Sequence, residues 1–225
     1  MLKFYFHPTP NPMKVALFLQ EAELDFELVP VDTMKGEQHT EAYRAINPNG
    51  KTPAIVDGDK RIFDSNAILL YLSEKTGKFA GNPKDRGELL SWLMFIASGL
   101  GPFSGQSVHF RFVAPEGSEY GKNRYTREAE RHYEVLDKHL DGREFIVGDE
   151  YTIADIAAWG WIDKAERVLG EESLEAYPHL QRWFNSINAR PAVERARATG
   201  KDVAFKSDFD EEAKRAFFPS NYPKQ

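Results

Sequence analysis

The chain of 225 residues contains no cysteine. This absence excludes disulfide bonds, thiolate metal sites, CxxC redox motifs and a cysteine nucleophile. Any thiol chemistry on this protein must therefore use a thiol that a ligand supplies. The six histidines show no spacing typical of metal ligands, so we also expect no metal.

Long apolar runs and an excess of positive charge are missing as well. The strongest apolar runs, AILLYL and WLMFIA, are far shorter than the ~18 residues that a membrane span needs, and the N-terminus lacks the pattern of a signal peptide. The 35 acidic and 29 basic residues give a net charge of −6, which argues against a general affinity for nucleic acid or anionic membranes. We expect a soluble, cytoplasmic protein with neither kind of partner.

Residues 1–80 alternate between the patterns of strands and helices. Asn11 followed by Pro12 is a typical helix start, with Asn as the N-cap and Pro at the first helical position. Ser65 likewise predicts the cap of a helix that ends at Gly77. The expected elements are a strand at 2–6, a helix after 11, a strand at 26–32, a hairpin at 52–63 and a helix from 65. The first two strands should be parallel and the hairpin antiparallel.

From Asn82 onward the chain shows only helical patterns. Thr152 with Asp155 three residues later has the form of a capping box. We expect helices at about 84–98, continuing to 112 beyond a break at Gly99–Pro102, then at 123–140, 152–169 and 178–188, and a loosely packed or partly ordered tail from Gly200. The change of composition at 77–84 divides the chain into domains at 1–80 and 86–225.

Several segments together carry a family resemblance. NPNGKTPAIVDGDKRIFDSNAILLYLSEK resembles the glutathione-binding signature of the glutathione transferase superfamily, and TIADIAAWGWI resembles a helix of its C-terminal domain. TPN at 9–11, GEQH at 36–39 and GLGPFSGQ at 99–106 resemble the bacterial Nu class, which includes glutathione-dependent disulfide-bond oxidoreductases. The implied fold is a thioredoxin-like β-α-β-β-β-α domain followed by an all-helical domain. Pro12 stands where those relatives usually have Gly, and Asp64 where they usually have Glu.

The resemblance assigns residues to glutathione. On the residues alone, the Thr52-Pro53 peptide bond could be either trans or cis. The resemblance implies a cis proline, which exposes the Thr52 backbone to the cysteinyl unit of glutathione. Asp64 and Ser65 begin a helix, where backbone N–H groups favour an anion. On the residues alone a plain helix cap is the favoured interpretation of Ser65. The resemblance implies that Ser65 binds the γ-glutamyl carboxylate and Asp64 its ammonium, while Gln38 and Lys51 bind the glycyl end.

The same resemblance places the chemistry at Thr9 and Asn11. Only the thiolate of a thiol is nucleophilic, and donors aimed at the sulfur favour that charged form. The Thr9 hydroxyl and the Asn11 amide suit this role. Tyr5 and Tyr43 are alternatives, although Tyr5 lies within the first strand and is interpreted as core. His7 could also face the site, but a lone histidine at a strand end is more often structural.

Further residues are assigned to the helical half. By resemblance Arg131 reaches the active-site cleft, where a guanidinium would neutralise a ligand carboxylate; a solvated helix charge is the alternative. An aromatic-rich stretch could line a pocket for the second substrate, although such a stripe is more often core packing. Its members are Phe103, His109, Phe110 and Phe112.

The leading hypothesis is a glutathione-dependent thiol–disulfide oxidoreductase with modest transferase or peroxidase activity. Because the chain has no thiol, such an enzyme must use two glutathione molecules, one to attack the disulfide and one to resolve it. One alternative is a transferase that conjugates glutathione to electrophiles, and another is a non-catalytic binding or interaction protein. The superfamily also predicts a homodimer.

Overall fold

The computed structural model describes residues 1–171 and 173–222, and within them the chain separates into two compact units. The first unit comprises Met1–Ile68 together with the described residues from Arg195 onward, and the second comprises Leu69–Glu194. The sequence-based division instead placed the tail in the helical domain. The tail joins the first unit because its helix α11 (Glu211–Phe217) packs on the short 3-10 helix η1 (Thr33–Lys35).

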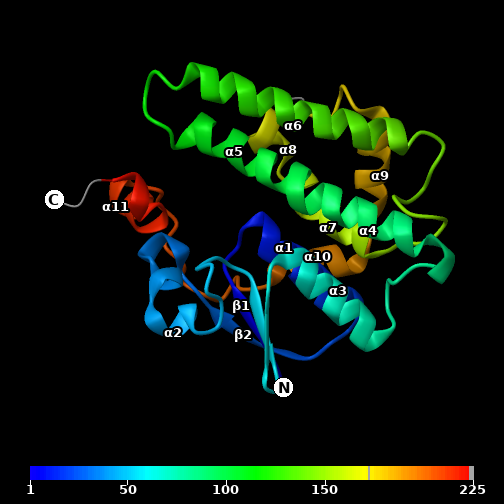
Figure 1. Cartoon of the computed structure of the whole chain (residues 1–225), viewed down its shortest axis with the longest axis horizontal. Helices are drawn as coiled ribbons and strands as arrows, with labels where there is room; N and C mark the ends of the chain where they lie inside the picture. Colours follow the sequence, from blue (N-terminus) through cyan, green and yellow to red (C-terminus); the bar gives the residue numbers. More distant parts are fainter. Residues whose placement is uncertain (172, 223–225) are drawn as a thin grey trace. The chain divides into compact units, whose positions relative to one another are not determined.

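A four-stranded sheet of order β2-β1-β3-β4 forms the centre of the first unit (Figure 1). β1 (Leu2–Phe6) pairs in parallel with β2 (Phe26–Pro30), and β3 (Ala54–Asp57) pairs antiparallel with both β1 and β4 (Lys60–Phe63). The parallel pair and the hairpin are as expected from the sequence. The sheet belongs to the thioredoxin-like class.

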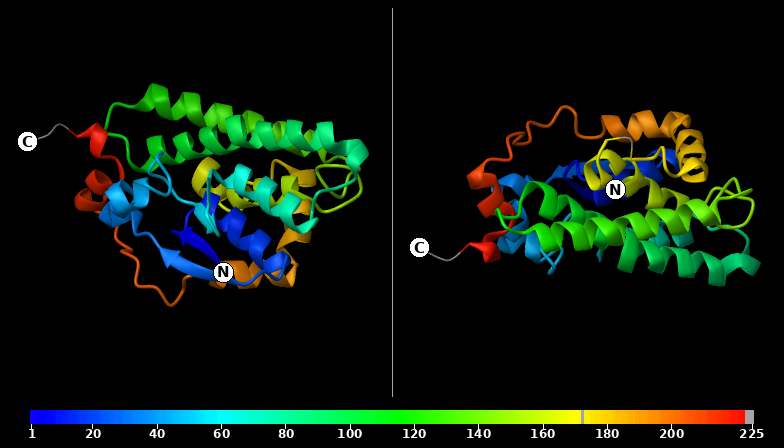
Figure 2. Two further views of the ribbon diagram at one scale, coloured as in Figure 1. Left: turned by 60° about the horizontal axis from the view of Figure 1, so that its bottom comes forward. Right: turned by 90° about the horizontal axis from the view of Figure 1, so that it is seen from above.

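Helices and a short irregular region complete the first unit. Between β1 and β2 lies α1 (Pro10–Glu21), in which every residue from Pro12 to Leu19 is buried. The region after β2 holds η1, η2 (Glu37–His39) and α2 (Glu41–Arg44), and α3 (Ser65–Thr76) follows β4. After α10 (Pro191–Ala198) the chain follows an extended path to α11 and the 3-10 turn η5 (Pro219–Asn221) (Figure 2).

The second unit contains helices and turns, with no strand in its described part. After the 3-10 turn η3 (Pro83–Asp85) come α4 (Arg86–Phe95), η4 (Ile96–Leu100), α5 (Gly101–Phe112), α6 (Glu119–His139), α7 (Ile153–Ile162), α8 (Ala165–Leu169) and α9 (Pro178–Asn188). α5 and α6 pack side by side (Figures 1 and 2).

Three local predictions for this helical region can be compared with the structure. The expected break at Gly99–Pro102 is a π-helical turn, η4, and not an interruption. The helix expected at 152–169 is divided into α7 and α8. The predicted capping box is present, with Thr152 accepting from Ala154 N–H and Asp155 accepting from Thr152 N–H.

No helix among the described residues is long and apolar enough to cross a membrane.

Candidate glutathione site

The sheet register brings the predicted site segments to one edge. Tyr5 lies opposite Ala54, and Ala54 lies opposite Phe63. Because β3 runs antiparallel to both neighbours, the chain that leaves β1 toward Thr9, the chain that enters β3 from Pro53 and the chain that leaves β4 toward Asp64 all meet at that edge. Parallel β2 ends at the same edge, so the region that follows it also begins there. The topology thus gathers residues that are far apart in the sequence.

The loop after β1 leads directly into α1. Thr9 is the N-cap, with extended backbone (φ −122°, ψ 163°), and its side chain makes no capping hydrogen bond. The helix therefore begins at Pro10, one residue before the predicted cap Asn11, which is a half-buried residue of the first turn. Pro10 occupies the first helical position because proline has no N–H to lose there. Pro12 falls in the same first turn, where N–H groups have no intrahelical partner.

The turn before β3 contains a cis peptide bond between Thr52 and Pro53, as the resemblance implied. The carbonyl of the preceding Lys51 accepts two hydrogen bonds, from the Tyr43 hydroxyl at 2.7 Å and from the Asn47 side-chain amide at 2.6 Å. These two bonds fix the backbone at the point where it presents Thr52.

Neither tyrosine alternative is favoured by these contacts. The Tyr43 hydroxyl donates its proton to the Lys51 carbonyl, and burial raises the pKa of Tyr43 far above its usual value. Tyr5 packs against a small apolar cluster that includes Tyr43, with the two ring centroids 5.8 Å apart. Tyr5 therefore has a packing role, as its position within the first strand indicated.

Asp64, and not Ser65, is the N-cap of α3. Its Oδ1 accepts from the N–H groups of Asn66 at 2.9 Å and Ala67 at 3.3 Å, and its carbonyl accepts from Ile68 N–H. Its backbone is left-handed, with φ +69°, a conformation that Asp tolerates better than most residues. Asp64 is exposed. A carboxylate held in this strained turn can accept a ligand ammonium while it caps the helix.

Ser65 is the first residue of α3 and is buried. Its hydroxyl lies 3.4 Å from Nζ of Lys14, a fully buried lysine on α1. Burial lowers the pKa of Lys14 to about 7, against the opposing effect of the Asp64 carboxylate. The start of α3 thus combines backbone N–H groups, a hydroxyl and an ammonium, all of which favour an anion.

Gln38 is also buried, and part of its side chain is already engaged. Its amide donates to the Thr33 carbonyl at 3.2 Å and to the carbonyl of Ala216, on the tail helix α11, at 3.4 Å. Its Oε1 has no hydrogen-bond partner among the described residues. Its Nε2 also lies 3.1 Å from Nε2 of His39. The assignment of Gln38 to glutathione stays a prediction.

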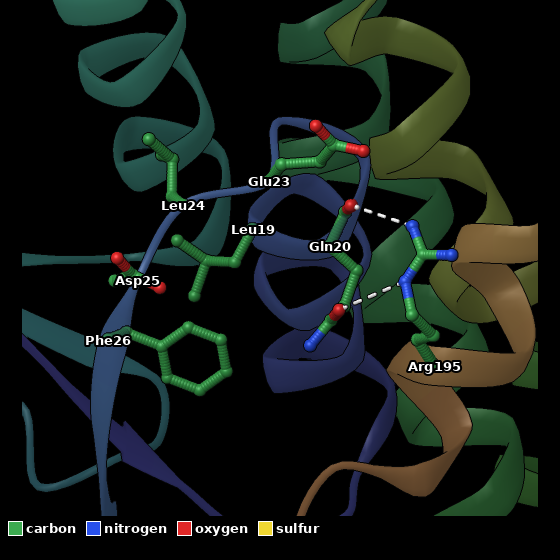
Figure 3. Close-up of a pocket in the computed structure, with 7 residues that line it drawn as sticks. All are labelled: Leu19, Gln20, Glu23, Leu24, Asp25, Phe26 and Arg195. Carbon is green, nitrogen blue, oxygen red and sulfur yellow. Dashed lines mark hydrogen bonds between the residues drawn. The ribbon is translucent and has the colours of Figure 1, made fainter.

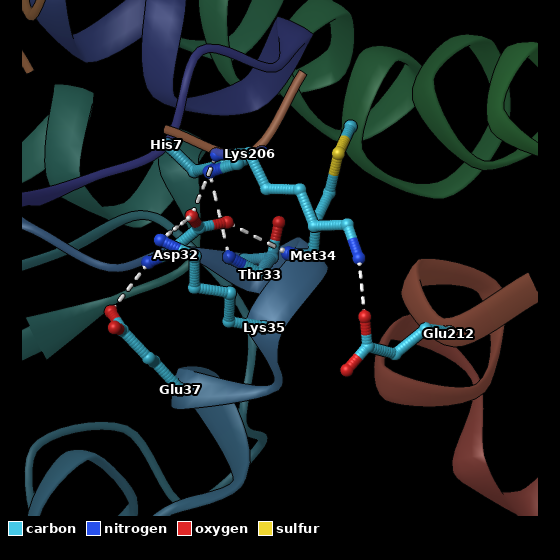
Figure 4. Close-up of polar contacts among 8 residues, drawn as sticks. All are labelled: His7, Asp32, Thr33, Met34, Lys35, Glu37, Lys206 and Glu212. Carbon is cyan, nitrogen blue, oxygen red and sulfur yellow. Dashed lines mark hydrogen bonds and ion pairs between the residues drawn. The ribbon is translucent and has the colours of Figure 1, made fainter. Parts of the chain in front are cut away.

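The tail also contacts the loop on which Gln38 lies (Figure 4). Asp32 accepts from the backbone N–H of Lys206 at 2.8 Å, caps η1 through Met34 N–H and pairs with Lys35. Burial acts to raise the pKa of Asp32, but these hydrogen bonds outweigh it and lower the pKa below its usual value. His7 belongs to this region too: it accepts from Thr33 N–H, its ring contacts Phe205, and burial lowers its pKa. The expected structural role of His7 agrees with these contacts.

Arg131 lies on α6 in the second unit. Its Nε donates to Glu128 at 2.6 Å, and Glu128 also accepts from Arg124 at 2.7 Å. These two arginines hold the pKa of Glu128 below its usual value. The Arg131 side chain is 54% exposed, so it retains N–H donors for other partners. Its assignment to glutathione stays a prediction.

The four aromatic residues predicted to line a second-substrate pocket divide into two sets. Phe103 and Phe110 both pack on Tyr125 of α6, with centroids 6.3 and 5.0 Å away, and the His109 ring lies 5.5 Å from that of Phe110. Phe112 is about half exposed and lies under the guanidinium of Arg167 on α8. The structure therefore does not gather all four around one point.

A hollow of about 360 Å³ on the first unit is a different feature (Figure 3). Leu19, Gln20, Glu23, Leu24, Asp25, Phe26 and Arg195 line it, and Arg195 donates to the side chain and the carbonyl of Gln20. The hollow lies at the C-terminal end of α1 and the start of β2, next to Arg195 of α10, whereas the predicted site lies at the N-terminal end of α1. The hollow is therefore not the predicted site.

Sequence reasoning missed Lys14, Asn47 and the tail contacts. A signal for Lys14 was present, because it is the one charged residue in the buried segment Pro12–Leu19 of α1. No comparable signal marks the contact between Gln38 and Ala216, since it joins residues 178 positions apart. Among the described residues there is also no group of three or more His, Asp or Glu able to hold a metal.

These features define the class, and comparison with known proteins agrees. Residues 1–74 match the family model "Glutathione S-transferase, N-terminal domain", and residues 99–191 match "Glutathione S-transferase, C-terminal domain". The chain belongs to the glutathione transferase family.

Two similar proteins of Escherichia coli strain K12 bear the same functional name. Disulfide-bond oxidoreductase YfcG is 43% identical over 204 residues, which cover 87% of this chain and 94% of the relative. Disulfide-bond oxidoreductase YghU is 40% identical over 223 residues, which cover 89% of this chain and 75% of the relative.

Solved structures of similar proteins contain glutathione. A glutathione transferase from Burkholderia graminis with two glutathione molecules bound per subunit is 36% identical, with a TM-score of 0.80 over 89% of this chain and 88% of that one. A glutathione transferase from Pseudomonas putida with one glutathione disulfide bound per subunit is 34% identical, with a TM-score of 0.81 over 88% and 91%.

Proposed function

We propose that this protein is a glutathione-dependent thiol–disulfide oxidoreductase. One observation carries the proposal: the chain has no cysteine but is similar to proteins named disulfide-bond oxidoreductases. Other similar proteins, named glutathione transferases, hold two glutathione molecules or one glutathione disulfide per subunit. Both sulfur nucleophiles must then come from glutathione. The residues proposed to bind glutathione are Asn11, Gln38, Lys51, Thr52, Pro53, Asp64, Ser65 and Arg131.

The reaction has two exchange steps. The thiolate of one glutathione attacks one sulfur of the substrate disulfide, so that a mixed disulfide forms and the first substrate thiolate leaves. The thiolate of a second glutathione attacks the glutathione sulfur of that mixed disulfide and displaces the second substrate thiolate. The two protons from the glutathione thiols end on the two product thiols, and glutathione disulfide is the oxidised product.

The protein contributes by favouring the thiolate and aligning it. Thr9 and Asn11 are the proposed catalytic residues. The Thr9 hydroxyl does not cap α1, which is consistent with donation to sulfur. Donors to the charged form lower a thiol pKa, and the N-terminus of α1 acts in the same direction. Alignment of the two sulfurs in one site supplies the remaining part of the rate enhancement.

The test compares two reactions of the purified protein. We expect glutathione-dependent reduction of hydroxyethyl disulfide, followed through a coupled reductase, to exceed conjugation of glutathione to an aromatic electrophile. Asn11→Ala should reduce kcat/KM for the disulfide by about 10- to 100-fold, the range of a hydrogen bond to a charged group. Asn185→Ala, on an exposed position of α9, is the matched control.

The opposite ratio of activities would assign the protein to the conjugating transferases, and no turnover in either assay would leave a binding protein. Unchanged turnover in Asn11→Ala would remove Asn11 from the mechanism.

We also propose that the protein is a homodimer. Sedimentation that shows a monomer at micromolar concentration would contradict this.

A further inference from the structure

Lys14 places a buried, titratable amine directly behind the first residue of α3. The side chain is 1% exposed, and Leu17 and Phe18, one turn further along α1, are fully buried as well. Its Nζ lies 3.4 Å from Ser65 Oγ, and among the described residues this is its one hydrogen bond. An ammonium carries three N–H donors, so two of them have no acceptor in the part of the chain that the structure describes.

Such a group is costly for the folded protein alone. Burial disfavours the charged form of a lysine, and a partner usually compensates. Within residues 1–171 and 173–222 the carboxylate that acts on this ammonium is that of Asp64, which is exposed and already caps α3. A methionine would fill a similar volume without this cost. The buried ammonium therefore has the features of a group that is retained for a ligand.

We infer that Lys14 is a positioning residue for the γ-glutamyl carboxylate of glutathione, acting through Ser65. The inference rests on the proposed function. When the ammonium donates to a lone pair of Ser65 Oγ, the Ser65 hydroxyl proton is directed away from Lys14. That proton is then oriented toward an acceptor at the start of α3. The positive charge behind the hydroxyl strengthens the hydrogen bond to an anionic acceptor.

This arrangement links binding to protonation. In the free protein burial lowers the pKa of Lys14 to about 7, opposed by Asp64, so that near pH 7.5 most molecules hold a neutral amine. A carboxylate bound at Ser65 favours the ammonium and raises this pKa. The ligand's own ammonium, beside Asp64, acts in the opposite direction, but Ser65, and not Asp64, is the residue within hydrogen-bond distance of the Lys14 Nζ. Glutathione binding should therefore take up a fraction of a proton above pH 7.

S-methylglutathione separates this proton from the one that the thiol releases. We would titrate the full-length protein calorimetrically at pH 7.5, in phosphate and in Tris, because the difference in heat between buffers gives the protons exchanged. We expect the wild type to take up about half a proton. Lys14→Met should bind about tenfold more weakly and take up none. Lys14→Gln, which keeps a donor without the charge, should recover part of the affinity but none of the uptake.

The control is Lys3→Met, which removes a half-exposed lysine of β1 and should match the wild type in both quantities. In a Ser65→Ala background, Lys14→Met should have little further effect on affinity, because the link to the ligand is already missing. If Lys14→Met equals the wild type in affinity and in proton uptake, the inference is wrong while glutathione binding stands. If the wild type binds neither glutathione nor its S-methyl derivative, the proposed function fails, and the inference with it.

Discussion

The two ends of the candidate glutathione site are built differently. At the α3 end, Asp64 caps its own helix and Ser65 contacts Lys14, all within the continuous N-terminal part of the first unit. At the other end, Gln38 and its loop are held by the tail, through Lys206 and Ala216. The first end depends on a buried charge and a strained turn, and the second depends on residues far away in the sequence. Substitutions at the α3 end should therefore change pH-dependent stability and glutathione affinity, whereas substitutions at the Gln38 end should change how firmly the tail is held.

The largest effect that we expect is on stability at the α3 end. Lys14 has a pKa of about 7 in the folded protein and 10.5 as its ordinary value. Between these two pH values the unfolded chain binds more protons, so stability rises with pH across this window. Lys14→Met should stabilise the protein by on the order of 5 kcal/mol below pH 7, and this gain should disappear toward pH 10.5. Urea unfolding at several pH values measures it.

Lys3→Met, which changes an exposed lysine, is the control for that series. It should shift the unfolding midpoint little at any pH. A constant difference between wild type and Lys14→Met from pH 6 to pH 10 would show that the buried amine does not titrate in this window.

A smaller effect separates the two roles of Asp64. Asp64→Asn keeps an acceptor for the cap and a residue that tolerates positive φ, but it loses the charge. We expect unchanged thermal stability and glutathione binding weakened by about 10- to 100-fold. Asp64→Ala should weaken binding similarly and also destabilise the protein by about 1 kcal/mol. If Asp64→Asn binds glutathione as tightly as the wild type, the proposed contact between Asp64 and the ammonium of glutathione is wrong.

The sequence predicted the α3 end of the site better than the end that the tail holds, and the reason is physical. The strands and the start of α3 follow from local signals, namely the pattern of strand-forming residues, Pro and Gly positions and helix-cap residues. The cis form of the Thr52-Pro53 bond was implied by the family resemblance, because the residues alone are compatible with either isomer. The identity of the cap was missed, because Asp64 and Ser65 are adjacent and both are good N-cap residues. A left-handed backbone at Asp64, which no local rule required, decided between them.

The tail could not be predicted in this way. It is polar with isolated aromatic residues, a pattern that indicates a loosely packed segment. Phe205 nevertheless contacts Phe6 and His7, and Gly200 lies so close to Phe6 that a Cβ would come within 2.9 Å of its ring. These contacts depend on the surface that forms when the sheet folds, and the tail's own sequence contains no information about that surface.

At the tail end we expect a moderate effect from Asp32→Ala. It removes the acceptor for Lys206 N–H and for Met34 N–H, so the tail should detach more often, at a cost of about 1–2 kcal/mol. Because the folded pKa of Asp32 is lowered, its contribution is present above about pH 4 and is lost as the pH falls through the folded value. Chymotrypsin should cleave the variant faster after Phe209 and Phe217. Equal cleavage rates would show that Asp32 does not hold the tail.

The smallest effect should come from Lys206→Met, which sharpens the assignment to Asp32. The Lys206 side chain pairs with Asp210 and Glu212, but its contact with Asp32 is made by the backbone N–H, which methionine retains. Exposed ion pairs contribute little. Chymotrypsin should therefore cleave Lys206→Met at the wild-type rate while it cleaves Asp32→Ala faster. Equal acceleration in both variants would mean that the side-chain pairs hold the tail, and Asp32 would then be only the cap of η1.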